Sequence, residues 1–294
     1  MKHATRIPIA GVHSPVYHVS DTSSTLDLAA ALLTDTTTAT PHLTTIIADH
    51  QSAGRGRLGR TWTTPDGQAL LASTIVSLPT SFPTEMLGWL VHACALSVRD
   101  ALSPRLSPLG HTVSLKWPND VLVDGARKIC GILAQLAPAS SPFTTSAILG
   151  YGINIAQDCD HLATPQATSL YVEGDTEAGA DPTSVSHTLL AQILTGLDSR
   201  IRGLVTHGNA RDCGLADEAA NALPLLGTRI ALAKPTDPNG HPAMEGVALG
   251  LSPTGSLLVA TDDGRTHDIN AGDVLATGIP LTTVHDTKEK RANN

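Results

Sequence analysis

Arginine and glycine alternate within one short segment of the chain, residues 49–62, which we call the arginine loop. It contains the run GRGRLGRTW, which includes Gly54, Arg55, Gly56, Arg57, Gly59 and Arg60. Glycine lets a backbone approach a ligand closely. The guanidinium group has a fixed fork of donors that suits phosphate and carboxylate oxygens. Three arginines this close repel one another unless an anion neutralises them, so the loop predicts a bound anion; the alternative is a solvated basic loop.

Three further clusters contain residue types suited to ligand binding or catalysis. The segment KWPND offers Asp120 as a carboxylate for a metal ion, a ribose or an amine, although Pro-Asn-Asp also suits a plain turn. The segment RKICG contains Lys128, and a lysine at the start of a strand is usually just solvated. It also contains Gly131, and a glycine inside an apolar strand indicates that another group approaches the backbone closely. The segment GYGIN again places two glycines in a strand, and Asn154 supplies an amide.

Several other kinds of site are excluded by their patterns. Residues 54–59 match G-x-G-x-x-G, but no helix follows and no acidic residue lies about twenty positions further on, so a dinucleotide-binding fold is discarded. There is no phosphate loop of the G-x-x-x-x-G-K-[ST] type and no G-x-S-x-G elbow. The 13 histidines show no metal-binding spacing, so a structural zinc site is not expected.

Composition limits the partners of the protein. The 294 residues carry a net charge of −8, so the arginine loop is a basic island on an acidic chain. This argues against broad nucleic-acid binding and favours a small anionic ligand. The four cysteines are widely spaced and are expected to be reduced thiols. Neither a membrane span nor a signal pattern is found, so we expect a soluble, cytoplasmic protein.

The hydrophobic pattern predicts the elements that position these clusters. Helices are predicted over residues 21–33, with Ser23 or Ser24 as cap, 83–106, stopping at Ser103-Pro104, 183–205, and within 209–223. Strands are predicted over residues 43–48, 68–78, 113–117, 121–123, 129–136 and 147–155. The polar stretch 157–182 is predicted to be a mobile loop with a short helical piece near Leu170.

The pattern of predicted secondary structure changes after residue 225. Short β-type runs alternate with turn signals, over residues 229–233, 244–251, 257–261, 266–270 and 273–277. This spacing predicts a small barrel of roughly 50 residues. Residues after Pro280 are expected to be a disordered tail. The chain is therefore expected to be a mixed α/β domain followed by a small β domain.

Taken in order, the clusters resemble those of the biotin protein ligases (biotin–[acetyl-CoA-carboxylase] ligases). The matching segments are Ser24-Thr25 at a helix start, GRGRLGRTW, KWPND, KICGIL and GYGINI. The resemblance covers about residues 20–280. It implies a mixed β-sheet with flanking helices, similar to the core of class II aminoacyl-tRNA synthetases, and a small C-terminal SH3-like barrel. The expected boundaries are an N-terminal extension at 1–19, a catalytic domain at 20–224, the barrel at 225–280 and a tail at 281–294.

The resemblance also implies a reaction in two steps. The carboxylate of biotin attacks the α-phosphate of ATP, which arrives with Mg²⁺, and gives biotinyl-5′-AMP and pyrophosphate. A lysine of a biotin carboxyl carrier domain, in a biotin-dependent carboxylase such as acetyl-CoA carboxylase, then attacks the anhydride. The reaction needs no protein nucleophile. It needs the reactants to be positioned and their negative charge to be stabilised.

The family pattern implies roles for individual residues. Biotin would contact Ser24, Thr25, Gln51, Gly54, Arg55, Gly56, Arg57, Lys128 and Gly131. ATP and the adenylate would contact Arg57, Arg60, Trp62, Asn119, Asp120, Lys128 and Asn154. Catalysis would rest on Lys128, Arg57 and Asp120, and residues 157–182 would cover the adenylate. No metal ligand is assigned among the protein side chains.

Two departures from the family pattern and two alternatives accompany this interpretation. Leu26 stands where the family usually has Asn, and residues 272–277 lack a basic residue that some members carry.

The N-terminus has no room for a DNA-binding domain, so a ligase that binds no DNA is expected, as a monomer or a homodimer. The alternatives are a lipoate/octanoate–protein ligase of the same fold and a non-catalytic module that binds biotinyl-adenylate.

Overall fold

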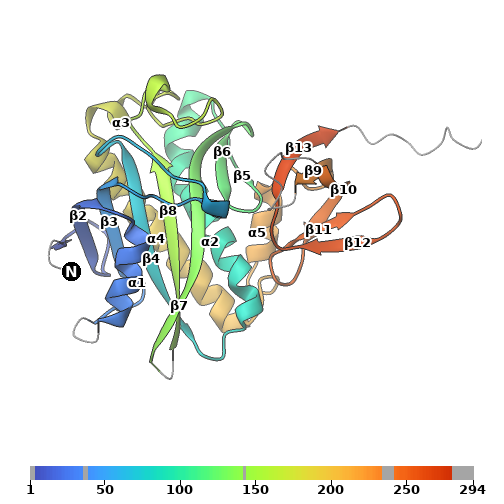
Figure 1. Cartoon of the computed structure of the whole chain (residues 1–294), viewed down its shortest axis with the longest axis horizontal. Helices are drawn as coiled ribbons and strands as arrows, with labels where there is room; N and C mark the ends of the chain where they lie inside the picture. The colour runs from blue at the N-terminus through green and yellow to red at the C-terminus, as the bar shows by residue number, and fades with distance from the viewer. Residues whose placement is uncertain (1–3, 36–38, 142–143, 234–241, 280–294) are drawn as a thin grey trace, which may run out of the picture. The chain divides into compact units, whose positions relative to one another are not determined.

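The computed structural model describes residues 4–35, 39–141, 144–233 and 242–279. The chain divides into two compact units (Figure 1). The first unit contains Met1–Pro224 with Pro253–Gly255, and the second contains Leu225–Ser252 and Ser256–Asn294. The first is a mixed α/β structure and the second an antiparallel β structure, which confirms the predicted fold class.

An eight-stranded sheet forms the centre of the first unit. Its strands are β1 (Thr5–Ile7), β2 (Val16–Thr22), β3 (Thr45–Gln51), β4 (Ala69–Pro79), β5 (Val113–Lys116), β6 (Asp120–Val123), β7 (Arg127–Ser141) and β8 (Thr144–Asn154). They lie in the order β1-β2-β3-β4-β8-β7-β6-β5. Strands β2 and β3 are parallel and the other neighbours are antiparallel. The order brings β6, β7 and β8 side by side, so their polar residues can meet.

Helices cover both faces of this sheet. Helix α1 (Thr25–Thr34) packs on β3, β4, β7 and β8, whereas α2 (Gly88–Leu106) contacts β5–β8 and pairs with α4 (Pro182–His207), which contacts β4 (Figure 1). Two shorter helices are α3 (Thr176–Ala180) and α5 (Leu215–Ala222). None of the helices in the described part of the chain is long and apolar enough to cross a membrane.

The face of the sheet under α1 carries several glycines. Gly131 of β7 pairs in register with Gly152 of β8, and Gly150 lies two residues before Gly152 on the same side. We call these three residues the glycine floor. Leu71 of β4 continues the row beyond Gly152, and Asp120 of β6 continues it beyond Gly131. The sheet backbone is thus open to close contact at this position.

Most predicted elements are present, with four corrections. β1 and most of β2 lie in the stretch expected to be an N-terminal extension, and they join the sheet. The helix predicted over 83–106 begins with a 3₁₀ turn, Thr84–Leu87, and continues past Pro104 to Leu106. Leu106 is fully buried, which favours continuation of the helix although Pro104 has no backbone N–H to donate. The helical piece expected near Leu170 is instead α3, further along the chain.

The second unit is a five-stranded antiparallel sheet. Its strands are β9 (Arg229–Ala233), β10 (Pro242–Leu251), β11 (Leu257–Ala260), β12 (Thr266–Ile269) and β13 (Asp273–Ile279), in the order β12-β11-β10-β9-β13. Most of its buried side chains are aliphatic, among them Ile230, Leu232, Leu257 and Val259. The expected tail after Pro280 lies outside the described residues.

Candidate functional site

The arginine loop forms a tight hairpin that leads from β3 to β4. Gly56 N donates to Arg60 O at 2.7 Å, and Trp62 N donates to Gly54 O at 2.9 Å. A side chain at Gly54 would collide with the carbonyl oxygen of Trp62, so only glycine fits there. These glycines lie within the hairpin, which contains one 3₁₀ turn at Arg57–Gly59, and the next element is the strand β4. Because no α-helix starts at the glycines, the arrangement agrees with the exclusion of a dinucleotide-binding fold.

Arg55 and Arg57 bond to residues outside the arginine loop. Arg55 Nη2 lies 2.7 and 2.6 Å from the two carboxylate oxygens of Asp27, in the first turn of α1. Arg57 Nη1 donates to Asn119 Oδ1 at 3.2 Å. The inference that this loop needs a bound anion to fold is therefore wrong for Arg55, because Asp27 supplies the negative charge. Asp27 was not predicted as a site residue, although an acidic residue in the first turn of a helix was an available signal.

Lys128 and Asp120 meet at the edge of the glycine floor. Lys128 Nζ lies 2.7 Å from Asp120 Oδ1, and both side chains are only partly exposed. Asp120 pairs with Gly131 and Leu122 pairs with Lys128, so one extra residue of β7, Ile129, is bulged between them. A bulge re-aims the side chains beyond it. It places Lys128 on the same face as Gly131 and Asp120, where an unbroken strand would have turned it to the other face.

The Trp62 side chain lies on the glycine floor beside Lys128. A Cβ atom at Gly152 would be 2.6 Å from the indole, and one at Gly131 would be 3.1 Å from it. Lys128 Nζ is 5.7 Å from the ring centroid, within the range of a cation–π contact. The indole nitrogen is buried and has no hydrogen-bond partner among the described residues. A buried donor of this kind is suited to a ligand that brings an acceptor.

The beginning of α1 reaches the same face through polar contacts. Ser24 caps the helix by accepting from Leu26 N at 3.3 Å, and it is buried. Thr25 donates from its N and its Oγ1 to Gln51 Oε1, at 2.7 and 3.0 Å, and accepts from Ser73 Oγ at 2.8 Å. Leu26, the departure from the family pattern, is buried against Gly150. The structure therefore brings Ser24, Thr25 and Gln51 together.

Asn154 shares the face of Gly152, but its amide is already bonded to the following loop. Its Nδ2 donates to Thr168 O at 2.8 Å, and its Oδ1 accepts from Gln157 Nε2 at 3.1 Å. The residue is 5% exposed. A contact from this amide to phosphate or Mg²⁺ would require it to exchange one of these bonds.

Residues 166–170 are packed against β7. Lys128 N donates to Gln166 O at 2.7 Å, and Thr168 N donates to Lys128 O at 2.8 Å. Thr168, Ser169 and Leu170 have no exposed surface. The expectation of a mobile loop is therefore wrong for this part, because its backbone hydrogen bonds and side chains are used in the fold.

Comparison with known proteins agrees with this geometry. The model of the Biotin/lipoate A/B protein ligase family matches residues 20–154, and that of the Biotin protein ligase C terminal domain matches residues 236–275. A biotin–[acetyl-CoA-carboxylase] ligase of Mycobacterium tuberculosis is 34% identical over 78% of this chain and 77% of its own length. The corresponding ligase of Paracoccus denitrificans is 31% identical over 75% of this chain and 85% of its own.

Further relatives extend the comparison to structure. A bifunctional ligase/repressor of Bacillus spizizenii is 29% identical over 76% of this chain, which spans 63% of that relative's length. The structure of Aquifex aeolicus biotin protein ligase in complex with biotin and ATP is 26% identical and superimposes with a TM-score of 0.61, covering 88% of this chain and 97% of the other. The chain belongs to the Biotin/lipoate A/B protein ligase family, among its biotin protein ligases.

Proposed function

We propose that this protein is a biotin–protein ligase that activates biotin with ATP and transfers it to a lysine of a biotin carboxyl carrier domain. The observation that carries the proposal is the Lys128–Asp120 ion pair, 2.7 Å long, at the edge of the glycine floor and beside the arginine loop. The floor leaves space for the side chains of Trp62 and Lys128 against the sheet, and the cations surround the place where negative charge must be held. We assign the catalytic unit to the first compact unit, which includes β1 and β2 and runs to Pro224.

In the first step, an oxygen of the biotin carboxylate forms a bond to the α-phosphorus of ATP and pyrophosphate leaves. Both reactants are anions, so the barrier depends on positive charge placed between them. Lys128 occupies that position, with Arg57 and Arg60 toward the phosphates and Trp62 toward the adenylate. Mg²⁺ enters with ATP as part of the substrate; Asp120 and Asn154 offer the oxygen ligands that it prefers.

In the second step, the amine of the acceptor lysine forms a bond to the acyl carbon of biotinyl-5′-AMP and AMP leaves. The amine must lose its proton before it attacks. Once Lys128 turns toward the adenylate, the carboxylate of Asp120 is available to orient the incoming lysine. Ser24, Thr25 and Gln51 bind the ring end of biotin, and Gly54, Arg55 and Gly56 bind beside it. ATP is supplied in the cytoplasm, where we place the protein.

The test supplies radiolabelled biotin, ATP with Mg²⁺ and a purified biotin carboxyl carrier domain of acetyl-CoA carboxylase. We expect pyrophosphate release that depends on biotin and label on one lysine of the carrier. The matched control replaces that lysine by arginine. Release of pyrophosphate with lipoate but not with biotin would instead support a lipoate ligase. Adenylate binding without any release would support a non-catalytic module.

A further inference from the structure

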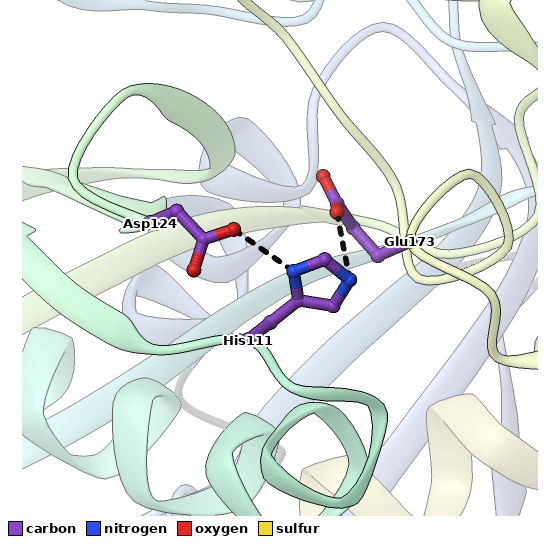
Figure 2. Close-up of side chains that lie close together, drawn as sticks. All are labelled: His111, Asp124 and Glu173. Atoms are coloured by element: carbon purple, nitrogen blue, oxygen red, sulfur yellow. Dashed lines mark hydrogen bonds and ion pairs between the residues drawn. The ribbon is translucent and has the colours of Figure 1, made fainter.

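A histidine and two carboxylates lie close together (Figure 2). With an arginine they form a compact cluster next to the proposed site. His111 lies between the carboxylates: its Nδ1 is 2.8 Å from Asp124 Oδ2 and its Nε2 is 3.4 Å from Glu173 Oε2. Asp124 is in the turn between β6 and β7, and Glu173 follows the packed segment 166–170. The cluster therefore joins two parts of the chain that are far apart in sequence.

Arg127 already provides the positive charge that such a cluster needs. Its Nε and Nη2 donate to the two oxygens of Glu173 at 2.6 and 2.8 Å, and its Nη2 also donates to Asp124 Oδ2 at 2.7 Å. A histidine with two carboxylates can bind a divalent metal ion. Here both ring nitrogens face carboxylates and a guanidinium group bridges those carboxylates, so the geometry is that of an ion-pair network.

Glu173 is the buried member of this network. Its side chain is 5% exposed, and Thr168 Oγ1 donates to its Oε1 at 2.6 Å. Burial raises the pKa of Glu173, but the hydrogen bonds from Arg127 and Thr168 outweigh burial and hold that pKa below its ordinary value. A buried carboxylate that is ionised depends on these partners, so the segment that carries Glu173 must dock where Arg127 is.

The same segment holds the backbone of Lys128. Gln166 O accepts from Lys128 N and Thr168 N donates to Lys128 O. The pairing of β7 with β8 begins at Cys130, after Lys128. At the edge of β7 that faces β8 further along, the Lys128 backbone therefore pairs with residues 166–168. Arg127 is its direct neighbour in the chain. The position of the Lys128 backbone therefore depends on how well residues 166–173 are fixed.

We propose that Glu173 is a positioning residue for Lys128. Through Arg127 and Thr168 it fixes residues 166–173 on the first residues of β7, and this holds the Lys128 ammonium group beside Asp120 and the reacting phosphate. The inference rests on the proposed function, since it assigns Glu173 to the adenylation step. Glu173 itself touches neither substrate.

The test compares Glu173→Gln with a matched variant, Asp175→Asn. Asp175 is two residues further on, its side chain is 9% exposed, and it makes an equivalent two-pronged ion pair, with Arg105 of α2. Both variants remove one buried charge from the same loop, but only Glu173 is connected to β7. For Glu173→Gln we expect kcat for biotin-dependent pyrophosphate release to fall roughly 10- to 100-fold, since small displacements of a catalytic group have effects of this size.

For Asp175→Asn we expect kcat within about twofold of wild type, even where its melting temperature falls as much as that of Glu173→Gln. Equal losses of kcat in the two variants would show a general stabilising role and overturn the proposal. Thr168→Val, which deletes the hydroxyl that donates a hydrogen bond to Glu173, provides a second and milder variant. It is expected to lower kcat in the same direction, and a soluble Thr168→Val protein with unchanged kcat would count against the proposal.

A double-mutant cycle tests whether Glu173 acts through Lys128. In a Lys128→Ala background, Glu173→Gln is expected to change the residual kcat by less than about twofold, because the group that it positions is gone. A loss as large as in the wild-type background would overturn the proposal. Wild-type protein that releases no pyrophosphate with biotin would refute the proposed function. An active wild type with an equally active Glu173→Gln variant would refute only the role of Glu173.

Discussion

The ammonium group of Lys128 reaches Asp120 across a residue that has no side chain. Their 2.7 Å ion pair lies over Gly131, which pairs with Asp120 in the sheet. A Cβ atom at Gly131 would be 3.1 Å from Lys128 Nζ and 3.1 Å from the indole of Trp62. The glycine in this apolar strand therefore leaves space for two side chains of the site at once.

Gly131→Ala should disturb both of these side chains. The added methyl group requires Lys128 and Trp62 to move by a few tenths of an ångström, and we expect kcat for pyrophosphate release to fall about tenfold. The control is Gly250→Ala in β10, where nothing lies within 4 Å of the added carbon. A Gly131→Ala enzyme as active as the Gly250→Ala enzyme would contradict the spatial argument.

Lys128→Ala should abolish most of the adenylation activity. Loss of a charge that stabilises the transition state typically costs at least about 100-fold in kcat, and we expect a loss of that size here. Arg202→Ala serves as the control, because Arg202 is an exposed cation on α4 paired with Asp198. Turnover is measured as pyrophosphate release at saturating biotin and ATP. Near-normal turnover of the Lys128 variant would remove the main catalytic assignment.

Asp27→Asn should loosen the arginine loop with little effect on overall stability. The Arg55–Asp27 pair is nearly half exposed, at 48% and 43%, and exposed pairs contribute about 0.2–1 kcal/mol. We expect a small change in melting temperature but faster tryptic cleavage after Arg55, Arg57 or Arg60. Asp262→Asn, which breaks a similar exposed pair with Arg229 in the second unit, is the control. Unchanged cleavage in the Asp27 variant would argue that the hairpin bonds alone fix the loop.

Acid should remove the contribution of the His111–Arg127 cluster to stability. The pKa of Glu173 is lowered from its ordinary value of 4.5. The pKa of Asp124 is held well below 3.8 by hydrogen bonds from the Thr112 backbone, His111 and Arg127. A carboxylate with a lowered folded-state pKa contributes stability above its unfolded-state pKa and loses that contribution as the pH falls through the folded-state value.

The urea unfolding free energies of wild type and Glu173→Gln should therefore differ most near about pH 7, and the difference should shrink as the pH falls below 4.5. The measurement is a series of urea titrations across this range, with Asp262→Asn as a variant whose charge is exposed. A difference between wild type and Glu173→Gln that stays constant or grows on acidification would contradict the ionised state of Glu173.

The local chemistry of this protein was predictable from its sequence. Glycines in the arginine loop and in two apolar strands indicated close approach to the backbone, and Gly54, Gly131 and Gly152 each face a neighbour that a side chain would meet. The sequence offered Ser23 or Ser24 as the cap before an apolar run, and Ser24 is the residue that caps the helix. The resemblance to biotin protein ligases rested on these motifs in order, and the family comparisons confirm it.

Tertiary structure decided which of these groups meet. The bulge at Ile129 turns Lys128 onto the face of Asp120, and it depends on the register between β6 and β7, which no local pattern specifies. Strands β1 and β2 were missed because their stability comes from pairing along the sheet. The Asp27–Arg55 and Glu173–Arg127 pairs join residues 28 and 46 positions apart. Periodicity reports on neighbours within one element, whereas these contacts exist only once the order of the strands is set.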